Sequence, residues 1–78
     1  MSTVDTIRAI QARHDLSQAV LCRYLGVPQG TLGNWLAPEG ASYAKEPSRA
    51  VARLVEVLAL VETLAPELHD AIVCAARE

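Results

Sequence analysis

Residues 17–36, SQAVLCRYLGVPQGTLGNWL, constrain the fold more than any other stretch of this 78-residue chain. Ser17 can cap a helix, because its hydroxyl can accept a hydrogen bond from a backbone N–H of the first turn. Leu21 and Leu25 are four residues apart and so lie on one face of that helix, and Gly26 supplies the backbone freedom to end it. The sequence therefore predicts a helix of about two turns followed by a tight turn.

A second short helix is predicted directly after this turn. Pro28 suits its first turn, because proline fixes φ near the helical value and lacks the N–H that would need a partner. Leu32, Trp35 and Leu36 have the three- and four-residue spacing of a buried helix face. Two short helices joined by a glycine turn form a helix-turn-helix, whose second helix can enter the DNA major groove. We expect four residues of the second helix to face outward: Gln29, Gly30, Gly33 and Asn34.

The same stretch resembles the helix-turn-helix of the Cro/C1 (Xre) repressor family. The matching features are LSQ at residues 16–18, LGV at residues 25–27 and TLxNW at residues 31–35. Cys22 stands where that family places a small residue that lets the two helices cross closely. The resemblance covers residues 4–64 and implies an all-α, compact five-helix bundle of the lambda-repressor-like helix-turn-helix type, with residues 1–78 forming one DNA-binding domain.

The outward residues are the candidates for reading bases. Gln29 is the best reader, because its amide can donate and accept at once and so match N6 and N7 of adenine. Asn34 can do the same or hold a phosphate. Gly30 and Gly33 weaken the helix by about 1 kcal/mol each relative to alanine, but they can permit a close approach to base edges. The helix contains no Arg or Lys, so reading of guanine by arginine is not expected from it.

Contacts to the DNA backbone are expected from two groups of residues. The family resemblance implies that Gln18 and Thr31 hold the sugar-phosphate backbone. Charge and position add a further set, for which a solvated surface or an internal ion pair is the alternative. This set is Arg23, Tyr43, Lys45, Arg49 and Arg53.

The charge distribution is uneven. The net charge of −2 and the pI near 5.6 argue against indiscriminate binding of nucleic acid. Residues 1–53, however, carry six basic against four acidic side chains, whereas residues 54–78 carry one basic and five acidic side chains. A mildly basic half can face phosphate while the acidic end stays in solvent.

Three further helices are predicted, over residues 2–14, 48–64 and 66–77, with a loop at residues 37–47 that contains two prolines and a glycine between its ends. The helix at 48–64 is apolar around most of its circumference, so helices over residues 48–78 are expected to contribute to a twofold dimer interface. Its expected inward face consists of Val51, Leu54, Val57, Leu58, Val61 and Leu64. The expected inward stripe of the last helix consists of Leu68, Ala71, Ile72 and Ala75.

Other kinds of site are not expected. Cys22 and Cys74 are 52 positions apart and are interpreted as reduced, buried thiols. His14 and His69 are interpreted as ordinary structural residues rather than as ligands or bases. No metal, cofactor or small-molecule ligand is expected, and no spacing of a nucleophile and a base suggests an enzyme. The chain contains no apolar run long enough to span a membrane and no signal-peptide pattern, so a cytoplasmic, nucleoid-associated protein is expected.

The function expected from these features is transcriptional regulation. The leading hypothesis is an autoregulating repressor that binds an inverted repeat in double-stranded DNA as a homodimer. The loop and the short C-terminal helices also resemble those of phage anti-CRISPR-associated repressors. The alternatives are an antitoxin of similar fold, or a protein-interaction module that keeps the helix-turn-helix without reading bases.

Overall fold

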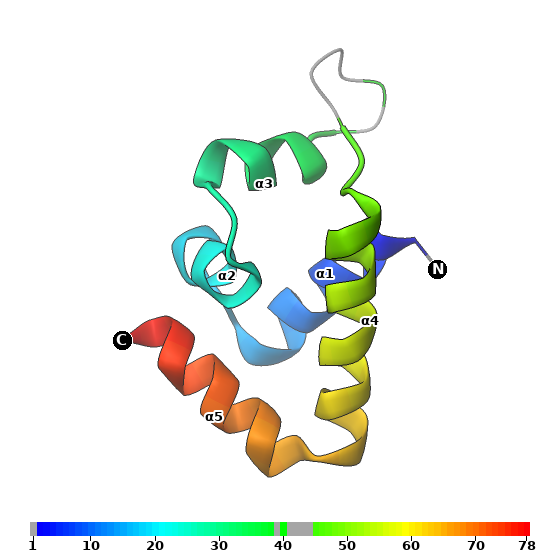
Figure 1. Cartoon of the computed structure of the whole chain (residues 1–78). Helices are drawn as coiled ribbons and strands as arrows, with labels where there is room; N and C mark the ends of the chain where they lie inside the picture. The colour runs from blue at the N-terminus through cyan, green and yellow to red at the C-terminus, as the bar shows by residue number, and fades with distance from the viewer. Residues whose placement is uncertain (1, 39, 41–44) are drawn as a thin grey trace.

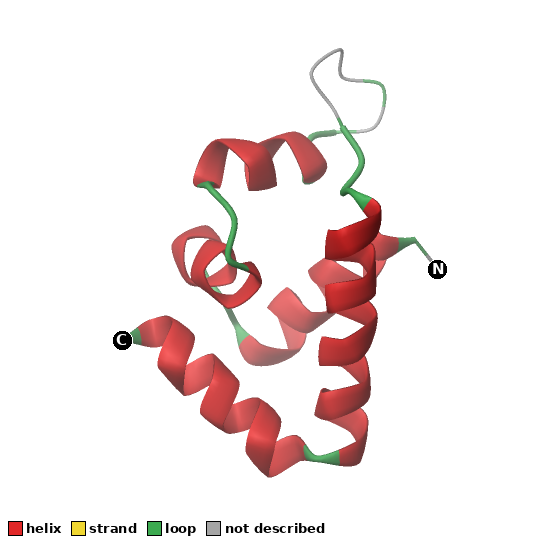
Figure 2. Cartoon of the chain, in the orientation of Figure 1, coloured by secondary structure: helices red, strands yellow, loops and turns green. Residues whose placement is uncertain are grey.

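Five helices pack against one another in the computed structural model, which describes residues 2–38, 40 and 45–78 (Figure 1). No strand occurs among these residues (Figure 2). The expected all-α architecture of five helices is therefore confirmed. The helices are α1 (Thr3–His14), α2 (Gln18–Leu25), α3 (Gln29–Trp35), α4 (Arg49–Leu64) and α5 (Pro66–Arg77).

The helix ends follow from local chemistry. Ser2, Ser17 and Ser48 each accept a hydrogen bond from a backbone N–H of the first turn of α1, α2 and α4. Such a cap satisfies one of the free N–H groups at a helix start. Asp15 and Gly26 end α1 and α2 in the left-handed conformation, with φ of 51° and 72°. The predicted start of α2 and its end at a glycine turn are thus confirmed.

The helix α2 packs against α3, α4 and α5, and α4 in turn packs against α1 and α5. In Figure 1, α3 crosses above α2, α4 runs along one side, and α5 returns from the far end of α4 towards α2. The Cα radius of gyration is 12.1 Å, close to the value of about 11.5 Å expected for a compact chain of this length. All helices contribute to one core: Ile7, Ile10, Leu16, Leu21, Cys22, Tyr24, Leu25, Leu32, Trp35, Val55, Leu58, Val73 and Ala76.

The predicted inward face of α4 is partly wrong. Val55 and Leu58 are the buried residues of this helix, whereas Leu54 and Val57 are about two-fifths exposed and Leu64 is 77% exposed. The helix has apolar residues on more than one side, so the three- and four-residue spacing fits two different faces equally well. Contact with α1 and α5 selects the side that carries Val55.

The predicted stripe of α5 is wrong by one residue. Its buried residues are His69, Val73 and Ala76, whereas Leu68, Ala71 and Ala75 are exposed and Ile72 is half-buried. One position corresponds to a rotation of about 100°, so the shift turns the expected inward face towards solvent. Cys74, expected to be buried, is exposed, and Cys22 is buried as expected. In the part of the chain that the structure describes, no helix is long and apolar enough to cross a membrane.

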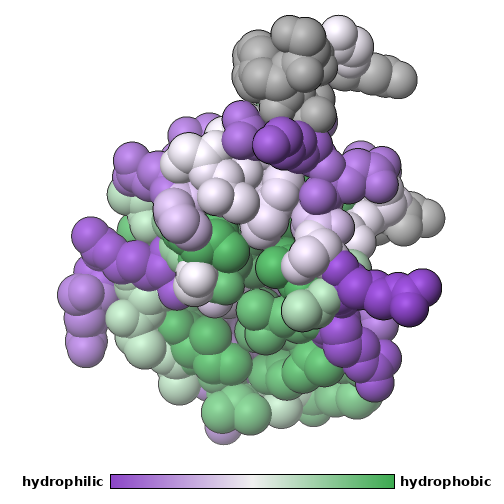
Figure 3. Space-filling view, turned by 45° about the horizontal axis from the view of Figure 1, so that its top comes forward, coloured by the Kyte–Doolittle hydropathy of each residue, from purple (hydrophilic) through white to green (hydrophobic). Residues whose placement is uncertain are grey.

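Several large apolar side chains of α4 and α5 are exposed. We call them the α4/α5 apolar face. The space-filling view of Figure 3 shows a broad hydrophobic area in its lower half, below hydrophilic and near-neutral surface on the α3 side. The large residues of the α4/α5 apolar face are Leu54, Val57, Leu60, Leu64 and Leu68.

Candidate nucleic-acid interface

The candidate interface is the outer side of α3, which two side chains fix to the core. Leu32 is fully buried and Trp35 is 8% exposed. They are three residues apart, so they lie on the same side of the helix and leave the opposite side free. The turn before α3 is tight, because the N–H groups of Gly26 and Val27 both donate to the carbonyl of Cys22, at 2.8 and 3.0 Å.

The C-terminal end of α3 is held by two hydrogen bonds from outside the helix. The guanidinium of Arg8 donates to the carbonyl of Leu36 at 3.0 Å. The backbone N–H of Lys45 donates to the carbonyl of Asn34 at 3.1 Å. Free carbonyls at a helix end need such partners, and these two connect α3 to α1 and to the segment before α4. A surface that must present side chains at fixed positions needs this rigidity.

The four predicted base-reading residues differ in exposure. Gln29 and Gly30, at the start of α3, are exposed, whereas Gly33 and Asn34 are half-buried. The reason is that the C-terminal half of α3 approaches the segment that carries Lys45. Gln29 is therefore the most accessible amide side chain on this helix.

The predicted backbone-contact residues surround α3 only in part. Gln18 and Arg23, both on α2, are exposed, and Thr31 on α3 is half-buried. Lys45 is exposed next to the end of α3, and Arg49 is exposed in the first turn of α4. The prediction for Tyr43 falls outside the described residues.

Arg53 has an internal partner. Its guanidinium donates to the carboxylate of Glu56 at 3.0 Å, and both side chains are mostly exposed. An exposed ion pair of this kind contributes little to stability, so Arg53 can exchange this partner for another anion at small cost.

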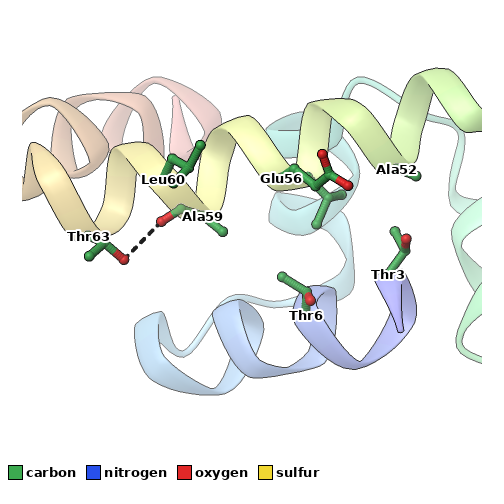
Figure 4. A pocket seen from close by; sticks show the side chains of 8 residues that line it. Thr3, Thr6, Ala52, Glu56, Ala59, Leu60 and Thr63 are labelled. Carbon is green, nitrogen blue, oxygen red and sulfur yellow. Dashed lines mark hydrogen bonds between the residues drawn. The ribbon is translucent and has the colours of Figure 1, made fainter. Parts of the chain in front are cut away.

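A separate groove lies between α1 and α4, with a volume of about 460 Å³. Figure 4 shows Thr3 and Thr6 on α1 facing Ala52, Glu56 and the following turns of α4. Its described lining contains one charged residue, Glu56, and that residue is paired with Arg53. The groove therefore lacks the positive charge that nucleic acid requires.

A cluster of polar side chains inside the helix bundle was missed by the reasoning from sequence. His69 is 1% exposed, and its Nε2 lies 2.6 Å from the hydroxyl of Tyr24. The His69 ring also packs against that of His14 in a tilted arrangement, with ring centroids 4.7 Å apart and 44° between the ring planes. This buried side chain joins α5 to α2 and α1, a packing role that the interpretation of His69 as an ordinary structural residue did not specify. The available signal was its position in register with the apolar residues Val73 and Ala76.

Glu62 on α4 completes this cluster. Its carboxylate accepts from the Arg13 guanidinium at 3.1 Å and lies 2.6 Å from Nε2 of His14. The hydrogen bonds from Arg13 hold the pKa of Glu62 below its ordinary value. Burial acts on the two inner groups, lowering the pKa of His69 and raising the pKa of Tyr24 to about 12. Both inner groups therefore favour their uncharged forms at neutral pH.

Comparison of the chain with protein-family models, with curated proteins and with solved structures found no match.

Proposed function

We propose that this chain is a sequence-specific, double-stranded-DNA-binding transcriptional regulator of the helix-turn-helix type. In this proposal it is an autoregulating repressor that binds an inverted repeat as a homodimer, with α3 as the recognition helix. The observation that carries the proposal is the way in which α3 packs on the core. Leu32 and Trp35 anchor one side, while Gln29 and Gly30 on the other side stay open to a partner.

The chemistry of the surface supports base reading over simple attraction to charge. Gln29 can make a two-point contact with adenine, and Gly30 beside it lets the helix approach a base edge. The exposed basic residues Arg23, Lys45 and Arg49 are few, so phosphate contacts supply only part of the affinity. Specificity would then come mainly from the major groove.

Twofold pairing through the α4/α5 apolar face would give the regulator two recognition helices. In a C2 dimer the two copies of α3 would enter successive major grooves about 34–36 Å apart. The target would then be an inverted repeat, because the symmetry of the site mirrors that of the protein. Occupancy of such a site near a promoter blocks transcription without any ligand or activation domain.

Selection of bound duplexes from a random pool tests this proposal. We expect enrichment of an inverted repeat with half-sites one helical turn apart, and adenine within each half-site. The logarithm of the affinity for the enriched duplex should fall linearly with the logarithm of the salt concentration, because neutralised phosphates release counterions. A pool without enriched sequence would contradict the proposal.

A second candidate function is a protein-interaction module, of which an antitoxin is one form. The observation in its favour is the α4/α5 apolar face, where Leu64 and Leu68 are 77% and 56% exposed. A surface of this kind binds an apolar partner, and such binding tolerates salt. Salt-tolerant association with a protein, in a chain that enriches no DNA, would favour this candidate.

A further inference from the structure

One buried nitrogen of the polar cluster lacks a partner. Nε2 of His69 contacts the hydroxyl of Tyr24 at 2.6 Å, but Nδ1 of the same ring is buried and has no hydrogen-bond partner among the described residues. If Tyr24 donated to Nε2, the proton of the neutral ring would sit on Nδ1 as a buried, unpaired donor. If Nε2–H donates to Tyr24, Nδ1 instead presents a bare lone pair. The second form is the one that a ligand at Nδ1 would complete.

His14 is held in the matching form. Its Nε2 lies 2.6 Å from the carboxylate of Glu62, which also accepts from Arg13 and is therefore the ionised acceptor of both groups. A neutral His14 must then carry its proton on Nε2, so that its Nδ1 also has a free lone pair. A carboxylate that fixes one ring nitrogen of a histidine while the other is free is the usual arrangement around metal-binding histidines.

A third donor lies beside the two rings. His14, His69 and Asp70 each offer one ligand atom, and these three atoms lie within 4.8 Å of one another. Ligands of a tetrahedral Zn²⁺ ion are about 3.4 Å apart, since each is about 2.0–2.2 Å from the ion. Closing on an ion therefore needs movements of roughly 1 Å, and the exposed side chain of Asp70 has the freedom to make them.

The surroundings suit a cation of this type. The charge of Arg13 is balanced by Glu62, and the guanidinium of Arg77 is occupied by the backbone carbonyl of His14 at 2.9 Å. The side chain of His14 is 24% exposed and Asp70 is exposed, so two of the three donor residues are partly open to solvent. Two imidazoles and one carboxylate form a donor set for Zn²⁺ and similar transition ions, with water as the fourth ligand.

We propose that His14, His69 and Asp70 form a binding site for a divalent transition-metal ion of the Zn²⁺ type, which links the end of α1 to α5. Tyr24 and Glu62 act as positioning residues that orient the two rings from α2 and α4. The site is built on the first turn of α5, at the opposite end of the molecule from α3 (Figure 1). The proposal is therefore independent of DNA binding. Its expected consequence is that the ion stabilises the folded chain.

Titration with zinc chloride tests the site. Binding is measured by calorimetry, and stability is measured by the melting temperature. The protein carries Cys74→Ser in every variant, so that the exposed thiol cannot bind the ion. We expect one ion per chain and a higher Tm, because an ion that binds only the folded state at 100 times its Kd raises the folded-to-unfolded ratio about 100-fold. Absence of saturable binding, or of any rise in Tm, overturns the proposal.

Variants identify the ligands. His14→Gln keeps an amide that can donate to Glu62 but removes the metal-binding nitrogen, and Asp70→Asn removes the carboxylate. Each should weaken Zn²⁺ binding at least about tenfold, with an unchanged circular dichroism spectrum. Glu67→Gln, an exposed acid on the same helix, is the matched control and should bind as the parent does. Affinity that stays unchanged in either ligand variant overturns the three-ligand site.

Discussion

Glu62 is the residue whose role is easiest to isolate, because two side chains from the end of α1 meet at its carboxylate. Arg13 and His14 are both at the end of α1, and Glu62 is on α4. The carboxylate side chain is 15% exposed, so its hydrogen bonds are better shielded from water than those of a surface pair. We therefore expect this contact to stabilise the packing of α1 against α4.

Replacing Glu62 should destabilise the fold at neutral pH. Glu62→Gln keeps the shape but removes the charge that Arg13 and His14 face, and the free energy of unfolding should fall by about 1–2 kcal/mol. Urea denaturation at pH 7 with a chelator measures this. Glu67→Gln on α5, an exposed acid, is the control and should change stability by less than about 0.5 kcal/mol. Equal stability of the two variants would contradict the role given to Glu62.

The same cluster predicts how stability depends on pH. The folded-state pKa of Glu62 is lowered, so its contribution is complete above the unfolded-state pKa of about 4.3 and is lost as the pH falls through the folded-state value. The lowered pKa of His69 also makes the folded state less stable as the pH falls. This loss begins near pH 6.5, because the unfolded chain takes up the proton at a higher pH than the folded chain does. Unfolding free energies measured with chelator from pH 7 to 3 should fall throughout. In Glu62→Gln the unfolding free energy should depend less on pH below about pH 4.5. A curve parallel to that of the parent would argue against the lowered pKa of Glu62.

At the scale of elements, α3 is a short helix that depends on its anchors. It has seven residues and no side-chain cap at Pro28, and two of its residues are glycines. Its stability therefore comes from the burial of Leu32 and Trp35 and from the two hydrogen bonds at its C-terminal end. A helix with weak intrinsic stability that is held by tertiary contacts is consistent with a surface whose residues serve binding more than helix stability.

Alanine replacements distinguish a glycine within a helix from a glycine that ends one in the left-handed conformation. A Cβ at Gly33 would meet nothing within 4 Å, and the position is helical, so Gly33→Ala should stabilise the chain by about 1 kcal/mol. At Gly26, which also has open space, φ is +72°, and Gly26→Ala should cost about 1–2 kcal/mol. Denaturant midpoints of the two variants should move in opposite directions. A shift of both in the same direction would contradict the assigned conformations.

The predictions from sequence succeeded where the signal is local. Ser17, Gly26, Leu32 and Trp35 determine the start, end and buried sides of α2 and α3 through contacts within a few residues, so their pattern is readable. The buried side of α4 could not be predicted in this way, because its apolar residues form two faces and only the packing of α1 and α5 selects one of them. The partners of His69 in the polar cluster could not be predicted either, since Tyr24 and His69 are 45 residues apart in sequence.

At the scale of the whole molecule, the α4/α5 apolar face is the feature that a monomer leaves unexplained. Burial of one exposed leucine side chain contributes roughly 1.5–3 kcal/mol, and a twofold interface uses each residue twice. Pairing across this face would cover exposed leucines while leaving α3 free on both copies.

A charge on the α4/α5 apolar face should prevent this pairing. Leu68 is 56% exposed, so Leu68→Glu should leave the fold intact but weaken self-association by at least about 3 kcal/mol, more than 100-fold. Ala12→Glu places the same charge on an exposed position of α1 and serves as the control. Sedimentation should give a dimer for the parent and the control and a monomer for Leu68→Glu. A parent that sediments as a monomer, or a Leu68→Glu dimer, would contradict the interface.

We propose that the outer side of α3 reads DNA bases, and a matched pair of variants tests this role most directly. Gln29 and Gln18 are both exposed glutamines, the first assigned to bases and the second to the DNA backbone. Base preference at each position of the selected duplex is measured for Gln29→Ala, Gln18→Ala and the parent. We expect Gln29→Ala to lose roughly 1–3 kcal/mol of discrimination at one position of each half-site, and Gln18→Ala to weaken binding to all sequences equally. Unchanged preference in Gln29→Ala would contradict it.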